Sequence, residues 1–60
     1  MRVEVEIWER GEVIGSYHVN TLTYHTEEAA REFMQKFNSE NGKTHTKDYY
    51  VIAKIGRIWP

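Results

Sequence analysis

Three histidines, His18, His25 and His45, are the residues of this sequence that could bind a metal ion. Imidazole is a common zinc ligand, and structural zinc sites combine His and Cys ligands at short, characteristic spacings. The sequence contains no Cys, and no two of its histidines are separated by such a spacing. We expect one histidine in a strand, one before a helix and one in a connector. They are too dispersed to converge, so we predict no metal site and no other cofactor.

Two carboxylates, Glu4 and Glu6, are the best candidates for acid–base chemistry. They are two residues apart in a stretch that alternates charged and apolar residues, which places them about 7 Å apart on one face of a strand. Paired carboxylates catalyse hydrolysis when a desolvated cleft drives their pKa values apart, and an open sheet face provides no cleft. Ser16 and Ser39 have no His and Asp placed to activate them. We therefore predict that the protein is not an enzyme.

The chain has 60 residues, a net charge of −1 and no Cys. That length suits one domain with a thin core. Without disulfides, stability must come from packing, or from packing plus self-association. The charge argues against a general nucleic-acid binder, and no apolar run approaches the roughly 20 residues of a membrane span. The N-terminus does not resemble a signal peptide, so we expect a cytoplasmic protein with no membrane partner.

The first strand is predicted over about residues 2–8, because apolar and other residues alternate strictly there. One face then carries Val3, Val5 and Ile7, and the other carries Glu4, Glu6 and Trp8. A polar segment with Gly11 follows and suits a hairpin turn. A second strand is predicted over about 13–20, with Val13, Tyr17 and Val19 on the buried face. Gly15 inside this run suggests a bulge or bend.

A helix is predicted over about residues 26–41. Thr26 is suited to cap its N-terminus. The two glutamates that follow place negative charge in the first turn, where it interacts favourably with the positive end of the helix dipole. One apolar stripe recurs at helical spacing and comprises Ala29, Ala30, Phe33, Met34 and Phe37. Charge pairs are expected between Glu27 and Arg31 and between Glu32 and Lys36. Gly42 is expected to end the helix in the left-handed conformation.

A third strand is predicted over about residues 49–58, which are rich in β-formers. One face is expected to carry Tyr49, Val51, Ala53 and Ile55, and the other Tyr50, Ile52, Lys54 and Ile58. A right-handed crossover places this strand beside the first. The sequence therefore predicts a single α+β domain over residues 1–60, in the order β-β-α-β. Its antiparallel sheet has the strand order 2-1-3, with the helix on one face.

One helix covers one face of such a sheet and leaves the other open. We expect the open face to carry Glu4, Glu6, Trp8, Ser16, His18, Tyr50, Ile52 and Lys54, with a charge pair between Lys54 and one of the glutamates. Single exposed aromatics are ordinary in a small domain. Trp8, Tyr50 and Ile52 together favour an interaction surface, because Trp and Tyr are enriched where interfaces have their energetic centres.

Two further routes to a partner are open. Trp59 either packs on its own domain or projects into a neighbour. The edge of the second strand, with His18, Thr21 and Thr23, has few charges to prevent another strand from pairing with it.

We therefore predict a non-enzymatic protein–protein interaction module that binds through the open sheet face or an edge strand and forms a homodimer or higher oligomer. The alternative is a single-stranded nucleic-acid-binding domain, with contacts from Trp8, Lys47, Tyr50, Lys54 and Arg57. Glu4 and Glu6 would repel phosphate on that face. In its compactness, mild acidity and aromatic-bearing sheet, the chain is similar in type to small phage-encoded inhibitors of host or defence enzymes, although no motif carries this similarity. The sequence does not identify the partner.

Overall fold

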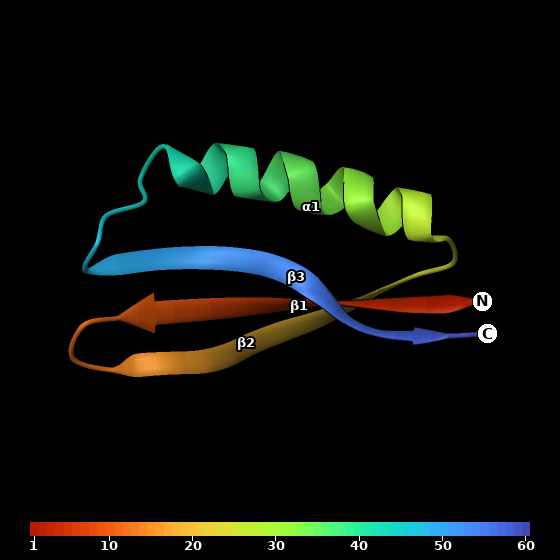
Figure 1. Cartoon of the computed structure of the whole chain (residues 1–60), viewed down its shortest axis with the longest axis horizontal. Helices are drawn as coiled ribbons and strands as arrows, with labels where there is room; N and C mark the ends of the chain where they lie inside the picture. Colours follow the sequence, from red (N-terminus) through yellow and green to blue (C-terminus); the bar gives the residue numbers. More distant parts are fainter.

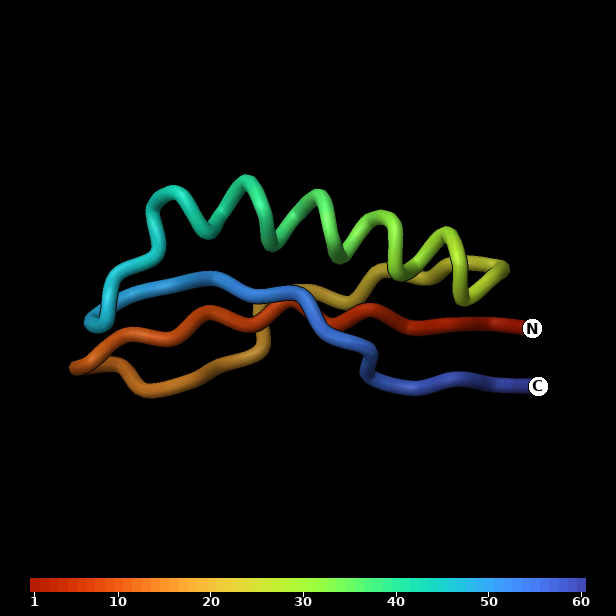
Figure 2. Tube along the Cα trace, turned by 45° about the horizontal axis from the view of Figure 1, so that its top comes forward, coloured from red at the N-terminus to blue at the C-terminus, as the bar shows by residue number.

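Three strands and one helix make up the computed structural model, which describes all 60 residues. The elements are β1 (Arg2–Gly11), β2 (Gly15–Tyr24), α1 (Glu27–Gly42) and β3 (Tyr49–Trp59). The strands form one antiparallel sheet in the order β2-β1-β3, which confirms the predicted topology. The sheet is strongly twisted, and α1 lies on one side of it, closest to β3 (Figure 1). The β1–β2 turn and the α1–β3 connector meet at one end, and both termini lie at the other (Figure 2).

The turn between β1 and β2 lies further along the chain than predicted, because β1 continues to Gly11 and β2 begins only at Gly15. β2 also runs beyond its predicted end, to Tyr24. The turn consists of residues 12–14. Gly15 opens β2 with a φ of 74°, in the left-handed region that glycine adopts without steric cost. This glycine therefore serves the turn, and the prediction that it bends the strand from within is wrong. Val13 was expected to face the core, but it lies in the turn and is 96% exposed.

Two β-bulges change which side chains face α1. In β2, Ile7 pairs with Asn20 but Trp8 pairs with His18, so Val19 is the additional residue. The extra residue reverses the alternation. Leu22 and Tyr24 consequently face the core side, and Val19 is 50% exposed where burial was predicted.

The second bulge lies in β3, at Gly56. Val5 pairs with Ile55 and Glu4 with Arg57, which leaves Gly56 without a partner. Up to this point the predicted faces of β3 are correct. Beyond it the alternation reverses, so Ile58 pairs with Val3 on the helix side. Its predicted place on the open face is therefore wrong.

The helix begins as predicted and ends differently. Thr26 Oγ1 accepts a hydrogen bond from the Ala29 N–H at 3.1 Å. The Arg31–Glu27 pair forms at 2.9 Å and is the one ion pair in the chain, so the second expected pair on the helix is absent. Gly42 belongs to the last turn and lacks the predicted left-handed conformation, and Lys43 caps the helix with a φ of −67°.

The core is as thin as the chain length implies. Four residues are buried: Val3 and Val5 from β1, Ala30 from α1 and Ala53 from β3. Two of the four are alanines, whose small side chains let the helix and the sheet approach closely. Six partly buried side chains surround them: Ile7, Tyr24, Phe33, Met34, Phe37 and Ile55.

Candidate functional site

The face of the sheet opposite α1 has no covering element, and we call it the open face. Because Val3 and Val5 are buried under the helix, the alternate residues of β1 point the other way. These are Arg2, Glu4, Glu6, Trp8 and Arg10. Side chains of paired residues share a face, so the register adds Ser16, His18, Thr21 and Thr23 from β2 and Tyr50, Ile52, Lys54, Arg57 and Trp59 from β3.

Every residue that the sequence suggested for partner binding lies on this open face: Glu4, Glu6, Trp8, His18, Tyr50, Ile52, Lys54 and Trp59. Two cations of the face, Arg2 and Arg10, were missed, although the alternation along β1 already implied them. Arg57 was expected only as a contact for nucleic acid, and the bulge at Gly56 places it opposite Glu4 on this face.

Trp8 lies at the centre of a cluster formed by all three strands. Its Nε1 donates to Glu6 Oε1 at 2.9 Å. The Lys54 ammonium lies 4.7 Å from the centroid of the indole, and the His18 ring meets Trp8 edge-on at 5.5 Å. Glu6 and Lys54 are opposite each other in the register but form no ion pair, so the expected cross-strand pair is absent. Lys54 makes a cation–π contact instead.

The Glu6 carboxylate lies in the space that a side chain at position 56 would occupy. A Cβ atom on Gly56 would lie 2.5 Å from Glu6 Oε2, far inside van der Waals contact. The glycine at the bulge therefore allows the Glu6 side chain to lie against β3 while it accepts the indole N–H of Trp8.

Trp59 packs on its own domain, against two guanidinium groups. The guanidinium carbon of Arg2 lies 4.7 Å from the ring centroid, and that of Arg57 lies 4.9 Å from it. The Trp59 Nε1 is buried without a hydrogen-bond partner. The ring therefore holds two cations in place at the end of the open face that is remote from Trp8.

Two shallow hollows adjoin at the other end, near the hairpin turn. The one on the open face has a volume of about 310 Å³ and is lined by Trp8, Arg10, Ser16, Tyr50, Ile52 and Lys54. The second, of about 570 Å³, lies between the turn and the α1–β3 connector. Arg10 and Tyr50 line both.

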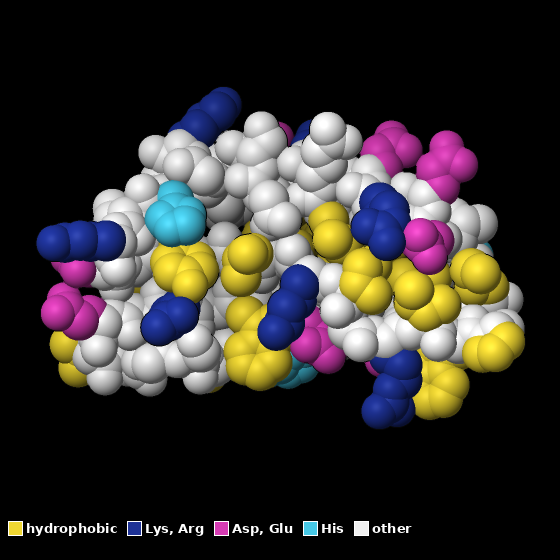
Figure 3. Space-filling model, viewed as in Figure 1, with side chains coloured by type: hydrophobic (Ala, Val, Ile, Leu, Met, Phe, Trp, Pro, Cys, Tyr) yellow, Lys and Arg dark blue, Asp and Glu magenta, His cyan; other side chains and the backbone are white.

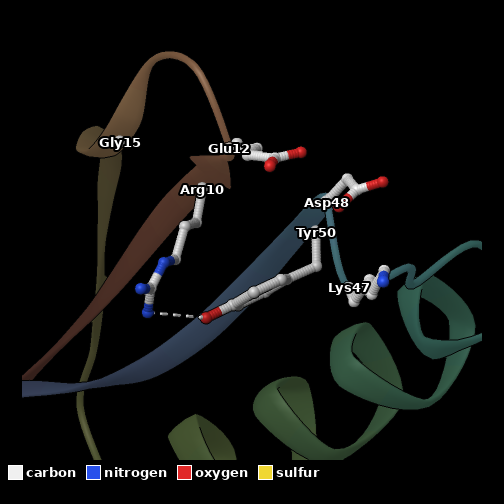
Figure 4. A pocket seen from close by; sticks show the side chains of 7 residues that line it. Arg10, Glu12, Gly15, Lys47, Asp48 and Tyr50 are labelled. Atoms are coloured by element: carbon white, nitrogen blue, oxygen red, sulfur yellow. Dashed lines mark hydrogen bonds between the residues drawn. The ribbon is translucent and has the colours of Figure 1, made fainter.

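Arg10 and Tyr50, which line both hollows, also contact each other. Arg10 Nη1 donates to Tyr50 Oη at 3.4 Å, and His45 stacks on the Tyr50 ring at 4.4 Å. Figure 4 shows the Arg10 side chain from β1 and the Tyr50 side chain from β3 reaching toward each other. The side chains of Glu12 and Asp48 point away from this contact. The Glu12 N–H donates to the Asp48 carbonyl at 2.8 Å, which ties the turn to the connector. Both hollows are open to solvent and suit a surface contact better than an enclosed substrate.

Charge is distributed unequally between the two sides of the molecule. The open face carries four cationic side chains, Arg2, Arg10, Lys54 and Arg57, and two carboxylates, Glu4 and Glu6. It is therefore cationic although the chain as a whole has a charge of −1. The helix carries more carboxylates than cations. Figure 3 shows Lys and Arg side chains among hydrophobic ones on the strands and carboxylates projecting from the helix.

The edges of the sheet are less available than the open face. On β3, the Ala53 N–H donates to Asn38 Oδ1 at 2.9 Å and Asn38 Nδ2 donates to the Ala53 carbonyl at 3.0 Å. At Ala53 the helix thus supplies both hydrogen bonds that an added strand would make. On β2, the bulge at Val19 interrupts the edge, and the Thr21 N–H bonds to Asn20 Oδ1 at 2.9 Å. Bulges and occupied N–H groups both oppose strand addition.

On the helix side of the sheet, beyond the core, two tyrosines lie near the Glu9 carboxylate. Tyr17 Oη donates a hydrogen bond to Glu9 Oε1. This bond, with smaller effects of desolvation and charge, raises the pKa of Tyr17. Desolvation, followed by the influence of the Glu9 carboxylate, raises the pKa of Tyr49.

Replacing Glu9 by Gln is expected to lower the pKa values of Tyr17 and Tyr49 toward the ordinary value of 10.0. A raised pKa in the folded state means that folding favours the protonated phenol. The resulting stability is present below about pH 10 and is lost as pH rises through the folded-state pKa. NMR titration of the tyrosine ring carbons measures each residue separately. The exposed Glu12→Gln in the turn is the matched control, and unchanged pKa values in Glu9→Gln would contradict the assignment.

Comparison with protein-family models, curated proteins and solved structures finds no match to this chain. No group of three or more His, Asp or Glu side chains is arranged to hold a metal ion. The helix is too short and too polar to cross a membrane.

Proposed function

We propose that the protein is a non-enzymatic protein-interaction module that acts in the cytoplasm, as an inhibitor or adaptor, and binds its partner with the open face. The observation that carries this proposal is the grouping of Trp8, Tyr50 and Ile52 on a face that no element covers. Trp8 and Ile52 are directly opposite each other in the register, and Tyr50 is two residues away along β3. All three line the same hollow.

The residue types of this group support binding. Trp, Tyr and Arg dominate the energetic centres of protein interfaces, and the hollow is lined by one of each. Ile52 is 40% exposed, which leaves apolar surface for a partner to cover. The bulge in β2 and the occupied backbone groups on the edges of β2 and β3 oppose strand addition, which favours the open face as the binding surface.

Single-stranded nucleic acid is a second candidate ligand, because the cationic side chains outnumber the carboxylates on the open face. Aromatic side chains that stack on bases, together with cations that contact phosphates, are the features of sequence-tolerant single-strand binders. Two tryptophans, one tyrosine and four cations lie on the face.

Selection of random peptides displayed against the immobilised protein tests the proposed function. We expect binders whose affinity falls about thirty-fold or more in Trp8→Ser, as for a residue at the energetic centre of an interface. Val13→Ser, which removes an apolar side chain that is 96% exposed in the turn, controls for general loss of apolar surface. Circular dichroism checks that each variant is folded. If no selected peptide depends on Trp8, the open face is not a protein-binding surface.

A further inference from the structure

The hollow on the open face is lined by two cations, Arg10 and Lys54, and by the apolar surface of Trp8 and Ile52. Along β1 and β3 the successive pairs are Arg10 with Tyr50, Trp8 with Ile52, and Glu6 with Lys54. Each step is two residues, so the backbones of Arg10 and Lys54 are about 14 Å apart along the strands, with Trp8 midway. The long Lys54 side chain turns back toward Trp8, and its ammonium lies 4.7 Å from the indole centroid. No carboxylate lines the hollow.

Glu6, the nearest carboxylate, is held by other contacts. It accepts the indole N–H of Trp8 and lies where a side chain on Gly56 would be. Lys54 remains without a carboxylate partner, since its ammonium lies over the Trp8 ring. Arg10 is exposed and bonds only to a neutral phenol, at 3.4 Å. Both cations are therefore free to pair with carboxylates from outside the chain.

A second copy of this chain with its strands aligned to the first does not complement the open face. In such a face-to-face dimer the two-fold axis lies between the sheets, either along the strands or across them. Along β1, Arg2 and Arg10 mark the ends and Glu4 and Glu6 the middle. An axis along the strands, or one across them at the level of Glu6, brings cation onto cation at the ends and Glu6 onto Glu6 at the centre. Like charges in an interface cost several kcal/mol.

Binding of single-stranded nucleic acid is disfavoured because the aromatic rings of the open face already contact other side chains. Binding of this kind depends on ring faces that are free to stack on bases. Trp8 has Lys54 over its ring and His18 against it. Trp59 has two guanidinium groups within 5 Å of its centroid, and Tyr50 is stacked by His45. The ring faces of the tryptophans contact cations, and that of Tyr50 contacts His45, so these faces are not free to stack on bases.

From these observations we infer that the hollow binds an extended acidic segment of a partner protein, with two carboxylates four residues apart and an apolar residue midway between them. Alternate side chains of an extended segment are about 7 Å apart on one side. The two carboxylates then meet Arg10 and Lys54 while the apolar side chain covers Ile52, which is 40% exposed and directly opposite Trp8. This inference rests on the proposed function and specifies the chemistry of the partner.

A defined peptide tests the inference on the full chain. The probe is a capped nonapeptide of Ser and Gly with a central leucine and a glutamate two residues to either side. Titration is followed by NMR through the indole N–H signals of Trp8 and Trp59. We expect saturable shifts of the Trp8 signal, and an affinity about five-fold lower in Lys54→Glu and in Arg10→Glu, from the loss and reversal of an exposed ion pair. Lys36→Glu on the helix is the matched control and should bind normally.

Two further ligands make the outcomes distinct. The same peptide with lysines in place of glutamates should not bind, and equal or tighter binding of it would overturn the inference. An oligothymidylate that binds when the acidic peptide does not would assign the face to nucleic acid and overturn it as well. If the display selection yields peptides that depend on Trp8 but lack acidic residues, the proposed function stands and the acidic partner is wrong.

Discussion

Replacing Asn38 by Leu is expected to lower the free energy of unfolding by about 2–3 kcal/mol. The Asn38 side chain makes two hydrogen bonds with the backbone of Ala53, one as donor and one as acceptor. Each contributes about 0.5–1.5 kcal/mol, and a partly buried N–H or C=O group left without a partner adds a desolvation cost. A domain of this size has roughly 3–9 kcal/mol in total, so the loss is a large share of its stability.

The same substitution is expected to promote association through β3. Leu cannot pair with Ala53, so the strand edge that α1 now occupies becomes available to another chain. Urea unfolding followed by circular dichroism measures the first effect, and molecular mass in solution across concentrations measures the second. Gln35→Leu, an exposed amide about one turn earlier on the helix, is the control and should remain within 0.5 kcal/mol of the parent. Equal stability of the two variants would show that the Asn38 hydrogen bonds contribute little.

The element order and the strand order followed from the sequence because they depend on local patterns. Strict alternation over Val3 to Ile7 and the spacing of Ala30, Phe33 and Phe37 each indicate one buried face. The right-handed crossover then leaves one arrangement of three strands. The cap at Thr26 is equally local, because its acceptor and donor are three residues apart.

The errors arose where the register between strands decides the outcome. A bulge adds one residue to one strand, and only the partner strand shows which residue is extra. Val19 and Gly56 are such residues. Val19 was therefore wrongly expected to face the core, and the bulge at Gly56 reverses the face of Ile58. Asn38 was also missed, because a polar residue on a helix gives no sign that it will bond to a strand edge.

The residues of the candidate site that come before the bulges in their strands were predictable from the sequence. Trp8, Tyr50, Ile52 and Lys54 lie in regular stretches of β1 and β3, so their common face followed from alternation alone. The pairing of Lys54 with an indole instead of a carboxylate did not, since it depends on where Gly56 allows the Glu6 side chain to lie. That local arrangement leaves Lys54 without a carboxylate partner from its own chain.

Replacing Val5 by Ala is expected to lower the free energy of unfolding by about 2–3 kcal/mol. Val5 is fully buried on the helix side of β1, and it is one of only four residues in the core. Loss of two methyl groups removes about 0.8 kcal/mol of transfer free energy for each, and the cavity left under α1 adds to that cost. Val13→Ala is the identical chemical change at a side chain that is 96% exposed. It should alter the unfolding midpoint in urea very little.

The comparison of Val5→Ala with Trp8→Ser separates stability from binding. The two residues lie three positions apart on β1 but on opposite faces of the sheet, so Trp8 contributes to the open face and Val5 to the core. We expect Val5→Ala to unfold at lower urea while its folded fraction binds selected peptides normally. Trp8→Ser should lose binding with a much smaller change in the unfolding midpoint. If Trp8→Ser instead unfolds as readily as Val5→Ala, then the indole and its Glu6 hydrogen bond stabilise the sheet more than they serve a partner.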